Sequence, residues 1–218
     1  MTSSLVGSEM CIRDRNNGIS YKITNLPNAV QNLRAVSNGK NKVKLTWSAS
    51  DRAEGYLVYG QKNGKYGYVG MTDNNSKTTF TDIKALDTDY NYYWVFPYIT
   101  NINDKMQAGP CEKYVYAKGV LPAVKNLKAA SEKGGVKLTW GRVSGAEGYL
   151  VYGRRAGGNY EYIGMTRNDK YTDKKASKTE YNYYWVYPYH TNVQGKMIAG
   201  ATPKYTYGTV SYTHLTLP

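Results

Sequence analysis

The sequence predicts an all-β chain made of two tandem antiparallel β-sandwiches with seven strands each. Three observations support this prediction. A long block of sequence occurs twice, apolar and polar residues alternate within each block, and clusters of turn-forming residues separate the alternating runs. No stretch keeps an apolar period of 3.6 residues, so we expect no helices.

The internal repeat sets the domain organisation. Segment 43–47 (VKLTW) returns at 136–140, 54–60 (EGYLVYG) returns unchanged at 147–153, and 90–98 (YNYYWVFPY) returns as YNYYWVYPY at 181–189. Each copy is long enough to bury a core of its own. We therefore predict one domain over 26–118 and a second over 119–209.

The strands of each copy follow from period-two alternation. In segment 43–47, Val43, Leu45 and Trp47 share one face, which is typical of a half-buried strand. Segment 55–59 alternates in the same way and places Tyr59 outward. In the longest strand we assign the face of Tyr90 and its alternate neighbours to the core, so that the face of Tyr93 points outward.

Turns fall between these runs. The clusters SNGKN (37–41), QKNGK (61–65), DNNSK (73–77) and NINDK (101–105) are rich in the residues that favour tight turns. Short strands separated by such turns are typical of a sandwich of two antiparallel sheets.

In its order of motifs the repeat resembles fibronectin type III domains, an immunoglobulin-like fold. The motifs are a tryptophan in the second strand (Trp47, Trp140), the segment Gly-Tyr-x-Val-Tyr (55–59, 148–152) and a long strand that starts with tyrosine (Tyr90, Tyr181). The tyrosine-rich versions in gut clostridial surface proteins are the most similar. The resemblance implies a structural core of Trp47, Tyr90, Trp140 and Tyr181. It also implies a bacterial secreted or cell-surface protein that is not an enzyme.

The ends of the chain match nothing in the repeat. Residues 1–15 and 210–218 resemble translated sequencing-adaptor sequence of the kind that flanks reading frames from metagenomic assemblies, and the alternative is that they are native tails. We therefore expect two non-native tails, with 16–25 as a lead-in to the first domain.

Charge and composition bear on the partners. The formal net charge is +13, and lysines recur every few residues instead of forming a block. Such a charge favours anionic partners, but it also serves solubility alone. No apolar run is long enough to span a membrane. The basic and aromatic residues follow strand alternation, so nucleic acid is not the expected partner.

Residues with catalytic or metal-binding chemistry are sparse. His190 corresponds to Ile99 in the first copy, so a structural role is favoured over that of a general base. Asp82 and Asp173 recur, but each stands alone and is expected to cap a turn. Cys111 corresponds to Thr202, which argues against an internal disulfide or a metal site. We expect no enzyme activity, no cofactor and no metal.

Two functions remain, a spacer that holds another domain away from the cell and a binding module. For the second, the candidate ligand-binding residues are Tyr59, Tyr93, Tyr152 and Tyr184, which alternation directs outward as two side-by-side pairs. Exposed rings of this kind offer stacking faces to glycans, and nearby lysines suit an anionic cell-wall polymer. The alternative is cross-strand aromatic pairing that only stabilises the sheet.

Overall fold

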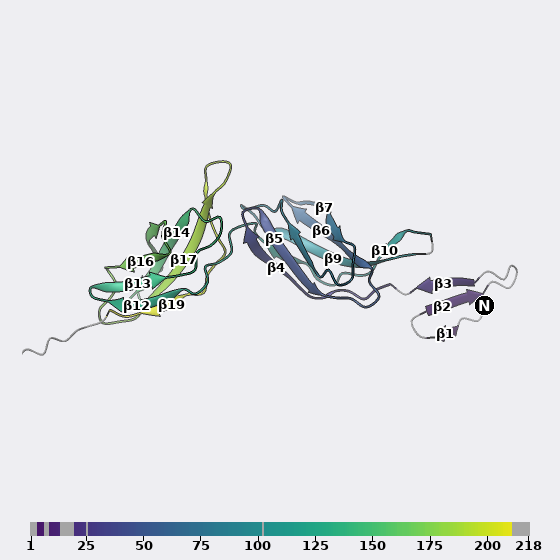
Figure 1. Ribbon diagram of the computed structural model, residues 1–218, viewed down its shortest axis with the longest axis horizontal. Coiled ribbons are helices and arrows are strands. Elements are labelled where there is room, and N and C mark those ends of the chain that lie inside the picture. The colour runs from purple at the N-terminus through teal and green to yellow at the C-terminus, as the bar shows by residue number, and fades with distance from the viewer. Residues whose placement is uncertain (1–3, 7–8, 14–19, 25, 102, 211–218) are drawn as a thin grey trace, which may run out of the picture. The chain divides into compact units, whose positions relative to one another are not determined.

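The computed structural model describes residues 4–6, 9–13, 20–24, 26–101 and 103–210, with side chains described from Leu26 onward. Within these ranges the chain consists of strands, turns and irregular segments without a helix (Figure 1). The predicted all-β class is therefore confirmed. The same ranges contain no helix that is long and apolar enough to cross a membrane.

The first repeat contains two antiparallel sheets. Its strands are β4 (Gln31–Gly39), β5 (Lys42–Ser48), β6 (Gly55–Lys62), β7 (Lys65–Thr72), β8 (Thr79–Asp82), β9 (Asn91–Thr100), β10 (Met106–Ala108) and β11 (Val115–Ala117). One sheet has the order β4-β5-β8. The other has the order β10-β9-β6-β7, with β11 also paired to β9.

The second repeat has the same topology. Its strands are β12 (Lys128–Glu132), β13 (Gly135–Thr139), β14 (Gly148–Arg155), β15 (Glu161–Thr166), β16 (Lys170–Asp173), β17 (Asn182–Thr191), β18 (Met197–Ala199) and β19 (Thr206–Gly208). The three-stranded sheet has the order β12-β13-β16. The five-stranded sheet has the order β15-β14-β17-β18, with β19 paired to β17.

Each repeat has eight strand segments, because the seventh strand of the predicted sandwich is divided in two. In the second repeat β18 and β19 pair with opposite ends of one edge of β17, and in the first repeat β10 and β11 both pair with β9. In the second repeat the carboxamide oxygen of Asn192 accepts hydrogen bonds from the backbone N–H groups of Gln194 and Lys196, both at 3.0 Å. This side chain closes the turn tightly enough for the chain to continue the pairing.

The core of each sandwich lies between its two sheets. In the second repeat it includes Leu138 from one sheet and Val151 and Val186 from the other, all fully buried. The sequence prediction that Trp47 and Trp140 are buried is confirmed, since each is 6% exposed. The ring of Trp140 meets that of Tyr149 edge-on at 5.2 Å between centroids, and Trp47 meets Tyr56 in the same way.

The compact units of the chain do not coincide with the repeats. One unit comprises Met1–Ala35, Lys44–Thr81 and Asn91–Tyr116, and the other comprises Val36–Val43, Asp82–Tyr90 and Ala117–Pro218. The domain boundaries at 26–118 and 119–209 stay predictions.

The N-terminal segment has a sheet of its own. Strands β1 (Ser4–Val6), β2 (Glu9–Arg13) and β3 (Ser20–Thr24) form an antiparallel meander in that order. Part of the expected tail 1–15 is thus paired with the lead-in 16–25. The non-native origin of both tails stays a prediction, and residues 211–218 of the C-terminal tail lie outside the described residues.

Candidate functional site: the aromatic outer face

The candidate tyrosines do not share one face of the sheet. Tyr59 and Tyr152 lie on the outer face and are partly exposed, as predicted. Tyr93 and Tyr184 are 0% exposed and lie in the core, so the prediction that they point outward is wrong. The side-by-side pairs that were expected between Tyr59 and Tyr93, and between Tyr152 and Tyr184, are therefore not formed.

The register between the two central strands explains this correction. Gly153 of β14 lies opposite Tyr184 of β17, and Tyr152 lies opposite Trp185. Opposite residues of an antiparallel pair project from the same face. Because Val151 is in the core, Tyr152 and Trp185 project outward and Tyr184 projects inward. In the first repeat the pairing of Tyr59 with Trp94 gives the same result.

The same inversion moves two residues out of the predicted core. Tyr90 is 44% exposed and Tyr181 is 56% exposed, so the assignment of both to the structural core is wrong. Both tyrosines directly precede the long strand and continue its outward face. The ring of Tyr90 is covered by the ammonium group of Lys118, 4.9 Å from the ring centroid, an attractive cation–π contact.

A buried polar group holds Tyr184 inside the second sandwich. Its hydroxyl donates to Asp173 Oδ2 at 3.1 Å. Asp173 is 2% exposed and accepts hydrogen bonds from Nη2 and Nε of the Arg155 guanidinium, at 2.7 and 2.8 Å. The expected turn-capping role of Asp173 is also present, since its Oδ1 accepts from the backbone N–H of Lys175 at 3.0 Å. Burial, followed by the charge of Asp173, raises the pKa of Tyr184 far above its ordinary value.

The outer face of the five-stranded sheet carries a connected set of aromatic rings, which we call the aromatic strip. In the second repeat it runs across β15, β14, β17 and the segment ending in β19, and neighbouring ring centroids are 4.9–5.9 Å apart. Its members are Tyr152, Tyr160, Tyr162, Tyr181, Tyr183, Trp185, Tyr187, Tyr205 and Tyr207. Four of the tyrosines, at 162, 181, 205 and 207, are more than half exposed.

The first repeat carries the same strip on the equivalent strands. Its members are Tyr59, Tyr66, Tyr68, Tyr92, Trp94, Phe96, Tyr114 and Tyr116. Each strip contains one pair of stacked tyrosines at the equivalent position. Tyr59 stacks on Tyr66 at 5.5 Å and 10°, and Tyr152 stacks on Tyr160 at 4.9 Å and 7°. The arrangement is therefore reproduced in detail from one copy to the other.

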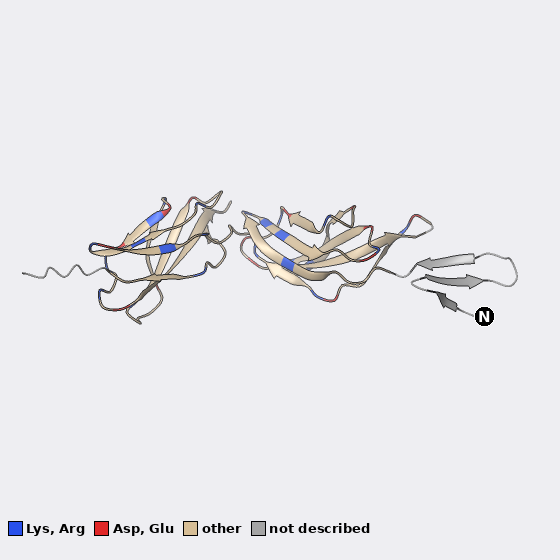
Figure 2. Ribbon diagram, turned by 60° about the horizontal axis from the view of Figure 1, so that its bottom comes forward, with Lys and Arg blue, Asp and Glu red and all other residues tan. Residues whose placement is uncertain are grey.

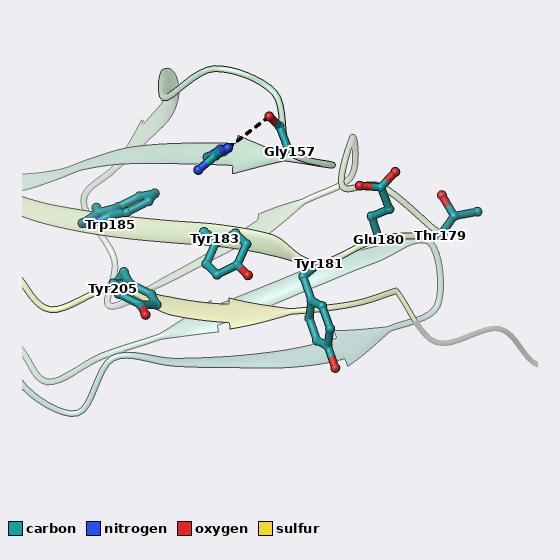
Figure 3. A pocket seen from close by; sticks show the side chains of 8 residues that line it. Gly157, Thr179, Glu180, Tyr181, Tyr183, Trp185 and Tyr205 are labelled. Carbon is teal, nitrogen blue, oxygen red and sulfur yellow. Dashed lines mark hydrogen bonds between the residues drawn. The ribbon is translucent and has the colours of Figure 1, made fainter.

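A hollow of about 680 Å³ opens on the strip of the second repeat (Figure 3). Its floor is formed by aromatic rings and its rim by one cation and one anion. The lining residues are Arg154, Gly157, Thr179, Glu180, Tyr181, Tyr183, Trp185 and Tyr205. Arg154 is held in place at the rim, because its guanidinium donates to the carbonyls of Gly158 at 2.9 Å and Gly157 at 3.2 Å.

Hydroxyl groups of the strip also contact one another. Tyr160 and Tyr187 are joined by a hydrogen bond of 3.2 Å between their hydroxyls. Burial, and then this bond, raises the pKa of Tyr160 well above its ordinary value. Tyr160 is therefore uncharged at neutral pH. Lys and Arg positions are spread over strands and turns of both repeats and do not gather on one strand (Figure 2).

Residues with other chemistry do not form a second site. Among the residues with described side chains, no three His, Cys, Asp or Glu residues lie close enough together to hold a metal ion. Cys111 is partly buried, and its thiol lies 3.2 Å from the carbonyl of Lys113. Burial raises the pKa of this thiol above its ordinary value, which lowers the thiolate fraction at neutral pH.

Sequence reasoning missed most members of the strips. The signal is present in the edge strands as the triplets Tyr-Gly-Tyr (66–68), Tyr-Val-Tyr (114–116), Tyr-Glu-Tyr (160–162) and Tyr-Thr-Tyr (205–207). Tyrosines two positions apart share a strand face. In most of these triplets the middle residue is small or polar. The two tyrosines on either side of it therefore indicate an aromatic outer face.

Comparisons with known proteins return structures but no family. No protein-family model and no curated protein matches the chain. A crystal structure of chicken CNTN1 FN1-FN3 domains is 11% identical and covers 93% of this chain and 75% of its own, with a TM-score of 0.38. An Fn3-like protein from Clostridium thermocellum is 21% identical and covers 43% of this chain and 98% of its own, with a TM-score of 0.35. The structure named FN3tt is 11% identical, covers 44% and 96%, and has a TM-score of 0.33.

Proposed function

We propose that the chain is a non-catalytic extracellular module of a larger bacterial surface or secreted protein, and that its aromatic strips are interaction surfaces. One observation carries the proposal. The same face of the same sheet is covered by connected Tyr and Trp rings in both repeats, and many of these rings stay exposed to solvent. Contiguous exposed aromatic surface of this kind is typical of interaction sites. Glycans and anionic cell-wall polymers are the candidate partners.

The non-catalytic part of the proposal is supported by the roles of the acidic residues. Asp173 is engaged by Arg155 and by the backbone of its own turn. Glu147 accepts hydrogen bonds from the backbone N–H and the hydroxyl of Thr191, at 2.9 and 2.7 Å. These carboxylates are engaged in hydrogen bonds that stabilise the fold, which supports a structural role over a catalytic one. The extracellular location in the proposal follows from the resemblance to fibronectin type III domains of surface proteins.

A pure spacer is the second candidate, and the contacts inside the strips favour it. Each ring of the strips has a neighbour within 5.9 Å, in a stacked, edge-on or tilted arrangement. Cross-strand aromatic pairs contribute roughly 0.2–1 kcal/mol each to a sheet. In a spacer the strips stiffen the five-stranded sheets and bind nothing.

A sedimentation assay separates these functions. The whole chain is incubated with purified bacterial cell walls and with insoluble neutral polysaccharides, and the bound fraction is measured. If the strips bind, the chain sediments with at least one of these materials. A variant with four exposed strip tyrosines replaced by the strand-forming residue threonine should then stay in solution. The replacements are Tyr66→Thr, Tyr68→Thr, Tyr160→Thr and Tyr162→Thr.

The matched control replaces exposed apolar residues outside the strips, Ile83→Thr and Val193→Thr, which are 64% and 95% exposed. It should sediment like the unaltered chain. Circular dichroism at the assay temperature establishes that both variants are folded. An unaltered chain that sediments with none of the materials contradicts the interaction function and favours the spacer. Equal sedimentation of the strip variant and the unaltered chain contradicts the assignment to the strips.

A further inference from the structure

We propose that the hollow on the second repeat is a binding site for a neutral glycan. In this site, sugar rings stack on Trp185 and Tyr183 while their hydroxyls bond to Arg154 and Glu180. This inference rests on the proposed function, since it places one ligand class at one point of the aromatic strip. The hollow lies within the 300–1,000 Å³ that is usual for ligand sites, at about 680 Å³.

The floor of the hollow is a fixed aromatic platform. Trp185 is held between Tyr160, edge-on at 5.1 Å, and Tyr205, tilted at 5.8 Å. Tyr183 is held in the same way by Tyr205 and Tyr207, at 5.8 and 5.9 Å. A pyranose ring has a face of C–H groups that packs on such a platform. Because the rings are already immobilised by their neighbours, little side-chain freedom remains to be lost on binding.

The rim of the hollow supplies both kinds of hydrogen-bonding partner. Arg154 uses two of its five N–H donors on the carbonyls of Gly157 and Gly158, which fixes the guanidinium and leaves donors for a ligand. Glu180 is exposed at another part of the rim and supplies carboxylate acceptors (Figure 3). Sugar hydroxyls both donate and accept, so they match a rim with one donor group and one acceptor group.

The charge of the hollow selects a neutral glycan over a polyanion. The chain as a whole has a net charge of +13, but the lining of the hollow contains one cationic and one anionic side chain. A polyanion bound there would place its negative groups close to the carboxylate of Glu180, which disfavours it. An uncharged polyhydroxylated ligand meets no such repulsion.

The first repeat has the same platform with a weaker rim. Gln61 stands where the second repeat has Arg154, and its amide donates to the carbonyl of Gly64 at 3.3 Å. A neutral amide gives weaker hydrogen bonds than a guanidinium. The site of the second repeat should therefore bind more tightly, and Arg154→Gln gives it the residue of the first repeat.

The test measures binding of the whole chain to soluble β-glucan, mannan and xylan by affinity electrophoresis. The chain should be retarded by at least one of these glycans. Arg154→Gln and Glu180→Gln should each weaken that binding about fivefold to tenfold, because a neutral amide replaces the charged group and forms weaker hydrogen bonds with the ligand. Trp185→Phe keeps a ring with a smaller face and should also weaken the binding. Matched controls away from the hollow are Arg142→Gln and Glu132→Gln, which should leave the binding unchanged.

The direction of the Glu180→Gln effect identifies the ligand class. Stronger binding of this variant to anionic cell-wall polymer, together with a steep loss of binding in salt, would show a polyanion and overturn the proposal. Unchanged glycan binding by both rim variants would also overturn it. If the strip variant of the preceding assay then still loses binding, the proposed function stands and only the hollow is excluded. If the unaltered chain binds no glycan and no cell wall, both proposals fail.

Discussion

The inward position of Tyr184 gives a sharp stability prediction for Tyr184→Phe. The substitution removes one hydroxyl from a side chain that is 0% exposed and so deletes the 3.1 Å hydrogen bond to Asp173. Hydrogen bonds to charged groups contribute about 1.5–3 kcal/mol. Arg155 and the backbone N–H of Lys175 still partner the carboxylate, so no unpaired charge remains. We therefore expect a loss near the lower end, about 1–2 kcal/mol.

The assay is urea unfolding of the whole chain followed by tryptophan fluorescence, fitted with separate transitions where the two repeats unfold independently. Tyr181→Phe is the matched control, because it removes the same hydroxyl from a ring that is 56% exposed. This control should change the stability by no more than about 0.5 kcal/mol. Equal, small effects of the two substitutions would refute the reasoning, because they would indicate that Tyr184 lies on the outer face.

Tyr184→Phe should also change how the stability of the chain depends on pH in the alkaline range. The pKa of Tyr184 is raised in the folded chain above its ordinary value of 10.0. Its contribution to stability is therefore complete below about pH 10 and is lost as the pH rises further, because the unfolded chain releases this proton first. Above pH 10 the unaltered chain should lose stability more steeply than Tyr184→Phe. Parallel pH dependence of the two proteins would contradict the raised pKa.

Three further predictions test the fold and its turns. Trp140→Ala should destabilise the second repeat by about 3–5 kcal/mol in urea unfolding, because the residue is 6% exposed and its removal leaves a cavity; a loss below 1 kcal/mol would contradict its place in the core. Glu147→Gln should reduce the fall in melting temperature that the unaltered chain shows as the pH is lowered below about 4.5. The hydrogen bonds from Thr191 lower the pKa of Glu147, so its contribution is present above the ordinary value of 4.5 and is lost as the pH falls below it. Gly164→Ala should lower the melting temperature, because a Cβ there would lie 2.5 Å from the hydroxyl of Tyr171, which is held by a bond to the carbonyl of Ile163. An unchanged melting temperature would show that the ring can move aside.

The fold class could be predicted from the sequence because several signals agree. The duplicated motifs set the number of sandwiches, and strict alternation around Trp47 and Trp140 identified the buried face of the second strand in each copy. In that strand the polar positions are Lys and Thr, so only one face can be the core. The division of the seventh strand into two segments could not be predicted, since β10 and β18 are only three residues long and follow a turn closed by one Asn side chain.

The orientation of the long strand could not be predicted in the same way, because both of its faces are bulky and apolar. Tyr183, Trp185 and Tyr187 alternate with Tyr184 and Val186. A strand with two apolar faces gives no hydrophobic signal for its register, and a shift by one residue exchanges the faces. The sequence prediction placed the larger set inside, whereas the structure places it outside.

Buried polar contacts determine which face of the long strand points into the core. On the inner face of β17, the amide of Asn182 is 0% exposed and bonds to the carbonyls of Ser177 at 3.0 Å, Glu180 at 3.2 Å and Gly208 at 3.3 Å. Two residues further along, Tyr184 reaches the buried Asp173. A shift by one residue would turn Asn182 and Tyr184 outward and break the hydrogen bonds that both side chains make in the core. These contacts fix the register at which the larger rings remain outside. The exposed aromatic strip is therefore a consequence of polar groups in the core.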